Sequence, residues 1–364
     1  MEQENQNSPN NESKKETVAS TESKKKGWRT WVGYLLKYGV PLLVTVLLCK
    51  LLFNGVNIDE MMSIITGQCN FLYIGIALFV AVFSHIFRAM RWRIQLNALG
   101  IAAPLFPLVL SIFGTYAVNL VLPRLGEVWR TGYIAKRQNS PFSTVFGSMV
   151  ADRLADTFTV LILTFVTFFL ATEQIGSYIG ENSSTLENVV TVATSPWLWL
   201  GVAACVALAW WFLSRPTRNP AIKKLQKFVK GLWAGFAVVA TMRGKGKWLL
   251  LTFCIWGCYF FQLYIAFYAF EFTADIIHRF GILAVLVTFV LSSLAMGVPS
   301  NGGIGPWQWS VIIALGMYGL AAEPATAFAN LVMGCQTLLI IALGIFTFVC
   351  IALDKRNATK GAGL

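Results

Sequence analysis

The chain has 364 residues, of which 56% are hydrophobic, 14% aromatic and 13% charged, and its formal net charge is +12. Average soluble domains are about half apolar and about a quarter charged, so this composition excludes a soluble globular protein and a disordered one. An integral membrane protein is the class that remains. Because basic residues collect on the cytoplasmic side of a membrane, the positive charge is interpreted as topology, and no nucleic-acid partner is expected.

Residues 1–27 are polar, and Met1 is not followed by the apolar segment that a cleavable signal peptide would require. We expect residues 1–30 to form a disordered tail. Lys24, Lys25 and Lys26 precede the first apolar run, and they favour a cytoplasmic position for this tail.

Six apolar runs are long enough to cross a bilayer, which takes about 20 residues in a helix. They are residues 34–53, 70–90, 145–171, 196–213, 248–270 and 325–352. Two further apolar stretches are interrupted: 104–122 ends at Pro123, and 281–320 breaks between Pro299 and Pro306. The sequence therefore predicts an all-α polytopic membrane protein with six full spans and two broken helical hairpins.

The distribution of acidic and basic residues indicates on which side of the membrane each connecting segment lies. Segments 54–69 and 172–195 carry acidic residues and no Lys or Arg, whereas 214–247 carries nine basic residues and no acidic one. Arg88, Arg91 and Arg93, at the end of the run 70–90, also mark the cytoplasmic side. Both termini are therefore predicted to be cytoplasmic, in a cell (inner or plasma) membrane. If 104–122 crossed the membrane fully, the four basic residues that follow it would lie outside, so charge favours a re-entrant hairpin that enters from the cytoplasm. Counting the remaining crossings in the same way makes 281–320 a hairpin that enters and leaves from the outside. Full spans at both stretches stay the alternative.

The order of elements repeats at an offset of about 180 residues, because each half contains two spans, a broken element and a further span. The first half starts inside and the second outside, which is an inverted-topology repeat, as in many alternating-access transporters. The predicted units are a first membrane repeat at 31–172, an extracytoplasmic loop at 173–195, a second membrane repeat at 196–353 and a cytoplasmic tail at 354–364.

Segment 219–241 differs from the spans. Apolar residues recur at three- and four-residue steps from Ile222 to Phe236, and four Lys lie between them. This pattern is typical of an amphipathic helix on the inner leaflet, where anionic lipid would attract each Lys by about 1 kcal/mol. A basic topogenic loop without lipid selectivity is an equal alternative.

Charged residues inside a predicted span form the first candidate site. Asp152, Arg153 and Asp156 lie early in the run 145–171, where a charge at the helix centre costs about 2.5–3.5 kcal/mol on insertion scales. Asp152 and Asp156 share a helix face, and Arg153 can pair with Asp156. The residues predict a headgroup or proton site, or alternatively a salt bridge that only orders the bundle.

The second candidate lies at the end of the stretch 104–122. Pro123 stops the helix, and Gly126 permits a tight turn. Arg124 and Arg130 offer planar donor forks that suit phosphate, and Glu127 can pair with Arg130 one turn later. An ordinary cytoplasmic loop with an ion pair is the alternative.

The third candidate is the Pro- and Gly-rich break at 299–306. Helix N-termini at such a break can face an anion. The residues concerned are Asn301, Gly302, Gly303, Gly305 and Gln308, with Pro299 and Pro306 as structural breaks. A plain turn between two spans is the alternative, and a nucleotide-binding loop is excluded because no Lys-Ser/Thr follows and no strand precedes it.

At these three motifs the sequence resembles the transmembrane region of the bacterial lysylphosphatidylglycerol synthase/flippase proteins and their stand-alone flippase-like relatives, over about residues 30–353. The family's first motif, of Pro, Arg, Gly-Glu and Arg, is matched by Pro123, Arg124, Gly126, Glu127 and Arg130. Its acidic-Arg-x-x-Asp motif is matched by Asp152, Arg153 and Asp156. Its Pro-x-x-Gly-Gly-Ile-Gly turn is matched by Pro299, Gly302, Gly303, Ile304 and Gly305, but Gln308 stands where the family commonly has an acidic residue.

The resemblance implies a lipid flippase-like transporter without the soluble aminoacyl-transfer domain of the synthases, since about a dozen residues follow the last predicted span. Its substrate would be a phospholipid or a lipid-linked headgroup. Arg124, Arg130 and Arg153 would hold phosphate. Glu127, Asp152 and Asp156 would balance these arginines, hold a cationic headgroup or carry a proton.

Two other functions stay open: a membrane enzyme that acts on lipid, and a non-transporting partner that organises other membrane proteins. His85 and His278 are the two histidines, and the seven Cys contain no CxxC pair, so neither a metal site, a cofactor nor a catalytic residue is expected. The sequence does not identify the lipid, the direction of transport, the coupling ion or the oligomeric state, a homo-oligomer included.

Overall fold

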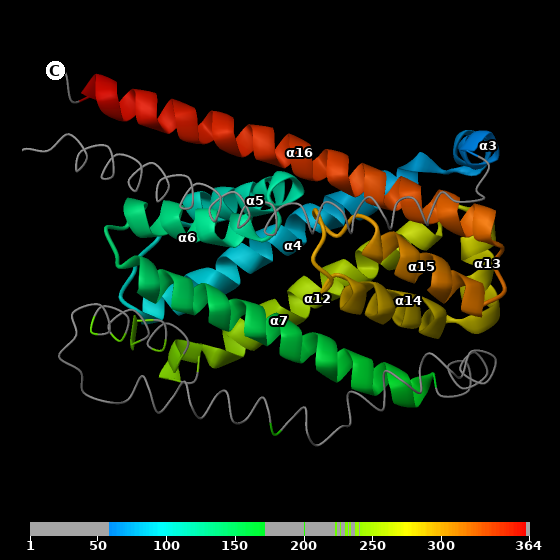
Figure 1. Cartoon of the computed structure of the whole chain (residues 1–364), viewed down its shortest axis with the longest axis horizontal. Helices are drawn as coiled ribbons and strands as arrows, with labels where there is room; N and C mark the ends of the chain where they lie inside the picture. The colour runs from blue at the N-terminus through cyan, green and yellow to red at the C-terminus, as the bar shows by residue number, and fades with distance from the viewer. Residues whose placement is uncertain are drawn as a thin grey trace, which may run out of the picture.

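The computed structural model describes residues 58–171 and 242–361, together with isolated positions between 200 and 241 (Figure 1). Within these residues the fold is helical, without strands. The helices are α3 (Ile58–Gln68), α4 (Phe71–Ala98), α5 (Leu105–Val121), α6 (Leu125–Arg137), α7 (Phe142–Leu170), α12 (Lys245–Phe267), α13 (Glu271–Phe280), α14 (Ile282–Ala295), α15 (Pro306–Met317) and α16 (Ala322–Gly361).

Four helices are long and apolar enough to cross a membrane: α4, α7, α12 and the Ala322–Asp354 part of α16. They agree with the predicted spans at 70–90, 145–171, 248–270 and 325–352. A fifth crossing results if α13 and α14, which meet at an angle of 112°, are counted as one span. The predicted spans 34–53 and 196–213, the tail 1–30 and the loop 173–195 lie outside the described residues, so the six-span count stays a prediction.

Three segments that the sequence analysis treats as loop or tail are helical. Helix α3 occupies most of 54–69 and packs against α16, and α16 itself continues beyond Asp354 to Gly361. Helix α13 fills 271–280, and its buried residues Thr273, Ile276 and Ile277 lie on one face. These helices were missed because short amphipathic stretches do not stand out as spans in a search for long apolar runs.

The two interrupted stretches are helical hairpins, α5–α6 and α14–α15, and each pair packs side by side (Figure 1). In the first hairpin, Gly126 lies directly against the backbone oxygen of Thr115, so a side chain there would collide with α5. The Asn119 side chain accepts the N–H of Gly126 at 2.8 Å, which joins the end of α5 to the start of α6. This close approach requires Gly, as the sequence predicts.

The tips of the two hairpins meet. Arg124 has a left-handed backbone (φ 61°), and its Nη2 donates to the carbonyl oxygen of Gly297 at 2.8 Å. Gly302, also left-handed at φ 64°, lies against the side chain of Leu120. The break after α5 and the break between α14 and α15 therefore contact each other across the two halves of the chain.

The long helices leave broad apolar surfaces uncovered. On α7 the side chains of Phe158, Phe165 and Phe169 are more than 60% exposed, and Leu338 and Ile345 on α16 are similarly exposed. Monomeric soluble proteins rarely expose apolar surface on this scale, whereas a lipid environment would cover it. The chain is thus a multi-pass membrane protein, and α4 and α12 pack extensively against each other within it (Figure 1).

Only isolated positions of the predicted amphipathic segment 219–241 are described. Lys223 and Lys230 are exposed, as a lipid-facing basic surface would require. Val238, in contrast, is buried in a small cluster with Met242 and Trp248, against Ile94 of α4. The end of this segment is therefore held by the protein, and its binding of anionic lipid stays a prediction.

Gly126→Ala should lower the stability of the protein by about 1–3 kcal/mol, because the added methyl group forces α5 and α6 apart. Gly132→Ala on the same helix is the matched control, since its Cβ would meet no atom within 4 Å. That change should be neutral or stabilise by up to about 1 kcal/mol through helix propensity. Thermal unfolding in detergent measures both, and equal stability of the two variants would contradict the close packing of the hairpin.

Candidate functional site

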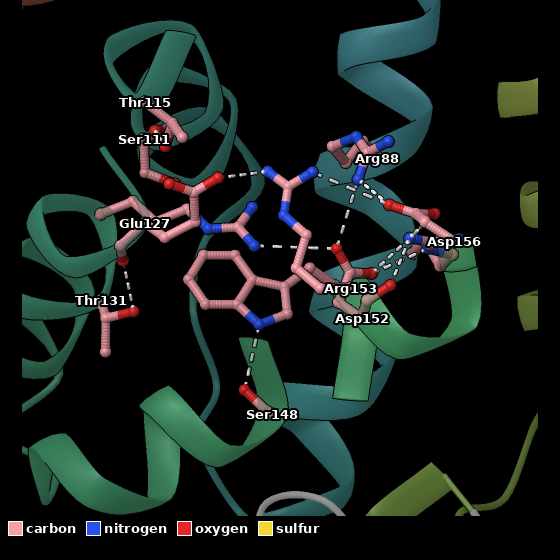
Figure 2. A network of polar contacts seen from close by, with 12 residues as sticks. Arg88, Ser111, Thr115, Glu127, Thr131, Ser148, Asp152, Arg153 and Asp156 are labelled. Atoms are coloured by element: carbon pink, nitrogen blue, oxygen red, sulfur yellow. Dashed lines mark hydrogen bonds and ion pairs between the residues drawn. The ribbon is translucent and has the colours of Figure 1, made fainter. Parts of the chain in front are cut away.

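A buried network of ion pairs joins α4 to α7 (Figure 2). The Arg91 guanidinium contacts Asp152 at 2.7 Å and Asp156 at 2.8 Å. Arg88, one turn earlier on α4, contacts Asp156 at 2.5 Å and Asp152 at 3.6 Å. All four side chains are buried, so each charge depends on the opposite charges of the neighbouring helix. Asp152 and Asp156 share one face of α7, as the sequence predicts.

Helix α6 contributes a second layer to this network. Glu127 forms an ion pair with Arg153 of α7 at 3.0 Å, and it accepts a hydrogen bond from the Asn119 amide at 3.2 Å. The structure therefore pairs Glu127 with α7, and not with Arg130 as expected from their spacing. Arg153 reaches Asp156 only at 3.9 Å, so the predicted local pair is the weaker of its two contacts.

Arg130 belongs to the network but does not line the cavity beside it. Its side chain is fully buried, 3.7 Å from Asp152, with the guanidinium 4.6 Å above the ring of Trp92. The indole N–H of Trp92 donates to Ser148 at 3.0 Å, which fixes the ring under the cation. Among the described residues, the Arg130 nitrogens have no hydrogen-bond partner, so the cation–π contact and Asp152 are what compensate its charge.

The network holds more positive than negative charge. Its arginines are Arg88, Arg91, Arg130 and Arg153, and its carboxylates are Glu127, Asp152 and Asp156. Four guanidinium groups against three carboxylates leave one positive charge without a counter-ion inside the network. An anion from outside the network is the group that this balance favours.

A cavity of about 320 Å³ opens beside the network, between the two halves of the chain. Arg88, Arg153 and Asp156 are its charged lining residues. Most of the remaining wall is aromatic or aliphatic, with Trp256, Phe289, Trp307, Leu263, Met296, Val332, Met333 and Ile340 among the lining side chains. Neutral polar groups come from Tyr116, Tyr259, Gln262, Gln336, Ser292, Ser293 and Thr337. The volume falls at the lower end of the range for small-ligand pockets.

The structure brings some of the predicted site residues together and separates others. Asp152, Arg153, Asp156, Glu127 and Arg130 form the network. Of the three arginines expected to hold phosphate, only Arg153 lines the cavity: Arg124 contacts Gly297 at the hairpin tips, and Arg130 is enclosed beside Trp92.

Of the third candidate site, at the break 299–306, some residues line the cavity and others cap a helix. Gly302 lines the cavity, while Gly303 lies against Met296. Gln308 accepts the N–H of Gly305 at 2.7 Å and donates to Asn330 on α16 at 2.7 Å, so both ends of its amide are used inside the protein. Asn301, within the break between α14 and α15, is partly buried. The positions Pro123, Gly126, Pro299 and Pro306 all fall at or beside breaks between helices, as expected.

The sequence analysis missed residues that the site uses most. Arg88 and Arg91 were interpreted as markers of the cytoplasmic end, yet they hold both aspartates. Their spacing of three residues, at the end of an apolar run, was a signal that could have placed them inside the bundle. The hydroxyl of Tyr259 accepts a hydrogen bond from Arg88 at 3.2 Å. The sequence gives no signal for this role, because Tyr259 is one of many aromatic residues in the apolar spans.

In the described ranges, no group of three or more His, Cys, Asp and Glu is placed to hold a metal ion. His85 is buried on α4 beside the cavity, with its ring against Phe113 and Tyr116.

Comparison with known proteins gives one family and two curated relatives. Residues 39–344 match the family described as "Lysylphosphatidylglycerol synthase TM region". The chain is 25% identical over 320 residues to "Glycosyltransferase AglD" of Haloferax volcanii, covering 80% of this chain and 50% of that protein. It is 21% identical over 159 residues to "UPF0104 membrane protein MJ1595" of Methanocaldococcus jannaschii, covering 43% and 45%. The chain thus spans about half the length of these relatives, and no solved structure matches it.

The charge balance predicts that two substitutions in the network differ strongly in their effect on stability. Asp152→Asn keeps the shape of the side chain but raises the excess to two positive charges, and it should cost about 3–5 kcal/mol of stability. Arg130→Met removes the excess and keeps contact with Trp92, so stability should change by less than about 1 kcal/mol. Thermal unfolding in detergent compares the two. A larger loss for Arg130→Met than for Asp152→Asn would show that Arg130 is a structural partner of the carboxylates.

Proposed function

The chain belongs to the lysylphosphatidylglycerol synthase transmembrane-region family, and from this premise we propose that it moves a phospholipid, or a lipid-linked headgroup, between the two leaflets of the membrane. The observation that carries the proposal is the cavity between the halves of the bundle. It combines two arginines with neutral polar groups, inside a protein whose outer surface is apolar. A charged headgroup could cross the hydrocarbon region only in such a sheltered polar site.

Arg88 and Arg153 are the groups we assign to the lipid phosphate. Both line the cavity, and the guanidinium fork suits phosphate oxygens. Asp156 holds Arg88 in place and faces the same space. Asp152 and Glu127 balance the arginines, which is one of the three roles that the sequence left open for the carboxylates.

Several features support an inverted repeat, the architecture that alternating access requires. The hairpins α5–α6 and α14–α15 meet tip to tip, as expected if they enter from opposite sides. In each half, the second helix of the hairpin also carries a polar side chain that contacts the following span: Arg130 with Asp152 in the first half, Gln308 with Asn330 in the second.

An enzyme that acts on lipid is the main competing function. One curated relative is named a glycosyltransferase, but this chain covers only half of that protein, and the name does not say which half is shared. The cavity of this chain offers ion pairs, amides and rings. It supports binding and passage of a headgroup more directly than bond cleavage.

The transport proposal predicts that purified protein accelerates exchange of fluorescent anionic phospholipid between leaflets of proteoliposomes. Arg153→Met should slow exchange by about tenfold or more, because a charged hydrogen bond of about 1.5–3 kcal/mol is lost. Arg137→Met is the control: Arg137 forms an exposed pair with Asp354, which is worth less than about 1 kcal/mol. Exchange no faster than in protein-free vesicles would disprove transport.

The proposed orientation places α3 and α13 outside and the C-terminal end of α6 in the cytoplasm. Helices α3 and α13, which contain Asp59 and Asp275, lie near one end of the bundle, and α6, which contains Lys136, lies near the other (Figure 1). On a Cys-less background, single cysteines at Asp59 and Asp275 should react with an impermeant reagent from outside intact cells, whereas a cysteine at Lys136 should react only after permeabilisation. External labelling at Lys136 would make α5 a full span and remove the inverted repeat.

A further inference from the structure

The second half of the chain carries an amide pair at the helix positions where the first half carries an ion pair. Arg88 is the eighteenth residue of α4, and Gln262 is the eighteenth of α12. Asp156 is the fifteenth residue of α7, and Gln336 is the fifteenth of α16. Both pairs are formed across their helices: Arg88 meets Asp156 at 2.5 Å, and Gln262 donates to Gln336 at 2.7 Å.

Both pairs line the same cavity, but at different depths of the bundle. Helices α4 and α12 pack against each other and run in opposite directions (Figure 1). Arg88 and Gln262 each lie past the midpoint of their own helix. Because the two helices run in opposite directions, these residues lie on opposite sides of the middle of the bundle. The cavity therefore has a charged end and a neutral end.

The neutral end retains hydrogen-bonding capacity. The bond between the two amides uses one N–H of Gln262 and the oxygen of Gln336, and an amide has two N–H donors and one oxygen. The oxygen of Gln262 and the amino group of Gln336 make no other hydrogen bond to the described residues. Ser293 and Thr337 donate their hydroxyl protons to backbone oxygens, so they present lone pairs as acceptors.

The charge on the cavity wall argues against an amine at this end. Asp156 is the carboxylate among the lining residues, and it already contacts Arg88, Arg91 and Arg153. An ammonium group next to the amide pair would find no carboxylate to pair with on the described wall. Hydroxyl groups, which both donate and accept, fit amide and hydroxyl partners without a charge.

We propose that Gln262 and Gln336 form a subsite for headgroup hydroxyls, and that the substrate is an anionic phosphodiester lipid with a polyol headgroup. This inference rests on the proposed function, since it assigns the phosphate of the same lipid to Arg88 and Arg153. The headgroup then spans the cavity, with its phosphate at the charged end and its hydroxyls at the amide pair.

Two lipids that differ only in hydroxyl groups test the subsite. Phosphatidylglycerol and phosphatidylpropanol have the same charge and a three-carbon headgroup, but the second lacks both hydroxyls. Equilibrium binding in detergent and leaflet exchange in proteoliposomes are measured for each, with phosphatidylinositol as a second polyol. Wild-type protein should favour both polyol lipids over phosphatidylpropanol by about tenfold, because amide groups would otherwise lose their partners.

The double variant Gln262→Met with Gln336→Met keeps side-chain length and removes the amides. Its preference for the polyol lipids should disappear, while its binding of phosphatidylpropanol stays unchanged. Gln68→Met, at the exposed end of α3, is the control and should keep the preference.

Equal binding of phosphatidylglycerol and phosphatidylpropanol by wild-type protein would overturn the hydroxyl subsite and leave transport standing. A preference that survives in the double variant would overturn it as well, as would the absence of binding of all three lipids. Preference in binding without any leaflet exchange would keep the subsite and disprove the transport function.

Discussion

The ion network between α4 and α7 is the constraint on which the rest of the structure depends. Charges inside a membrane protein are expensive, and a broken buried pair leaves an uncompensated charge. Asp152 and Asp156 can stay in an apolar span only because Arg88 and Arg91 meet them from α4. The network thereby fixes how these two helices face each other, and with them one wall of the cavity.

The α5–α6 hairpin connects the ion network to the second half of the chain. The α5–α6 hairpin brings Glu127 to Arg153, and Arg130 to the closed side of Asp152. Its tip also reaches the second hairpin through Arg124 and Gly297. The charged side chains that the first half contributes to the cavity wall and the neutral ones from the second half meet around one cavity. We propose that this asymmetry serves the binding of the two parts of a headgroup.

Much of the fold could be predicted from the sequence because the bilayer imposes a length and a composition on each span. The four described spans start within three residues of their predicted positions, although α4 continues to Ala98, beyond the predicted end at 90. The breaks at Pro123 and at 299–306 lie where Pro and Gly interrupt helices. The site was predicted less completely. The motif residues of α6 and α7 were found, but Arg88 was interpreted as topogenic, and Gln262 and Gln336 were not noticed, because one polar residue in an apolar helix has no partner visible in the sequence.

The sequence by itself determined the class of protein, the described spans, the helix breaks and the three motifs, because these depend on local composition and on residues close together in the chain. Only the tertiary structure decided which charges neutralise each other. Glu127 pairs with Arg153 and not with Arg130, and Gln308 caps a helix instead of facing the cavity. Partners such as Gln262 and Gln336 lie 74 residues apart, so their contact exists only once the helices have packed.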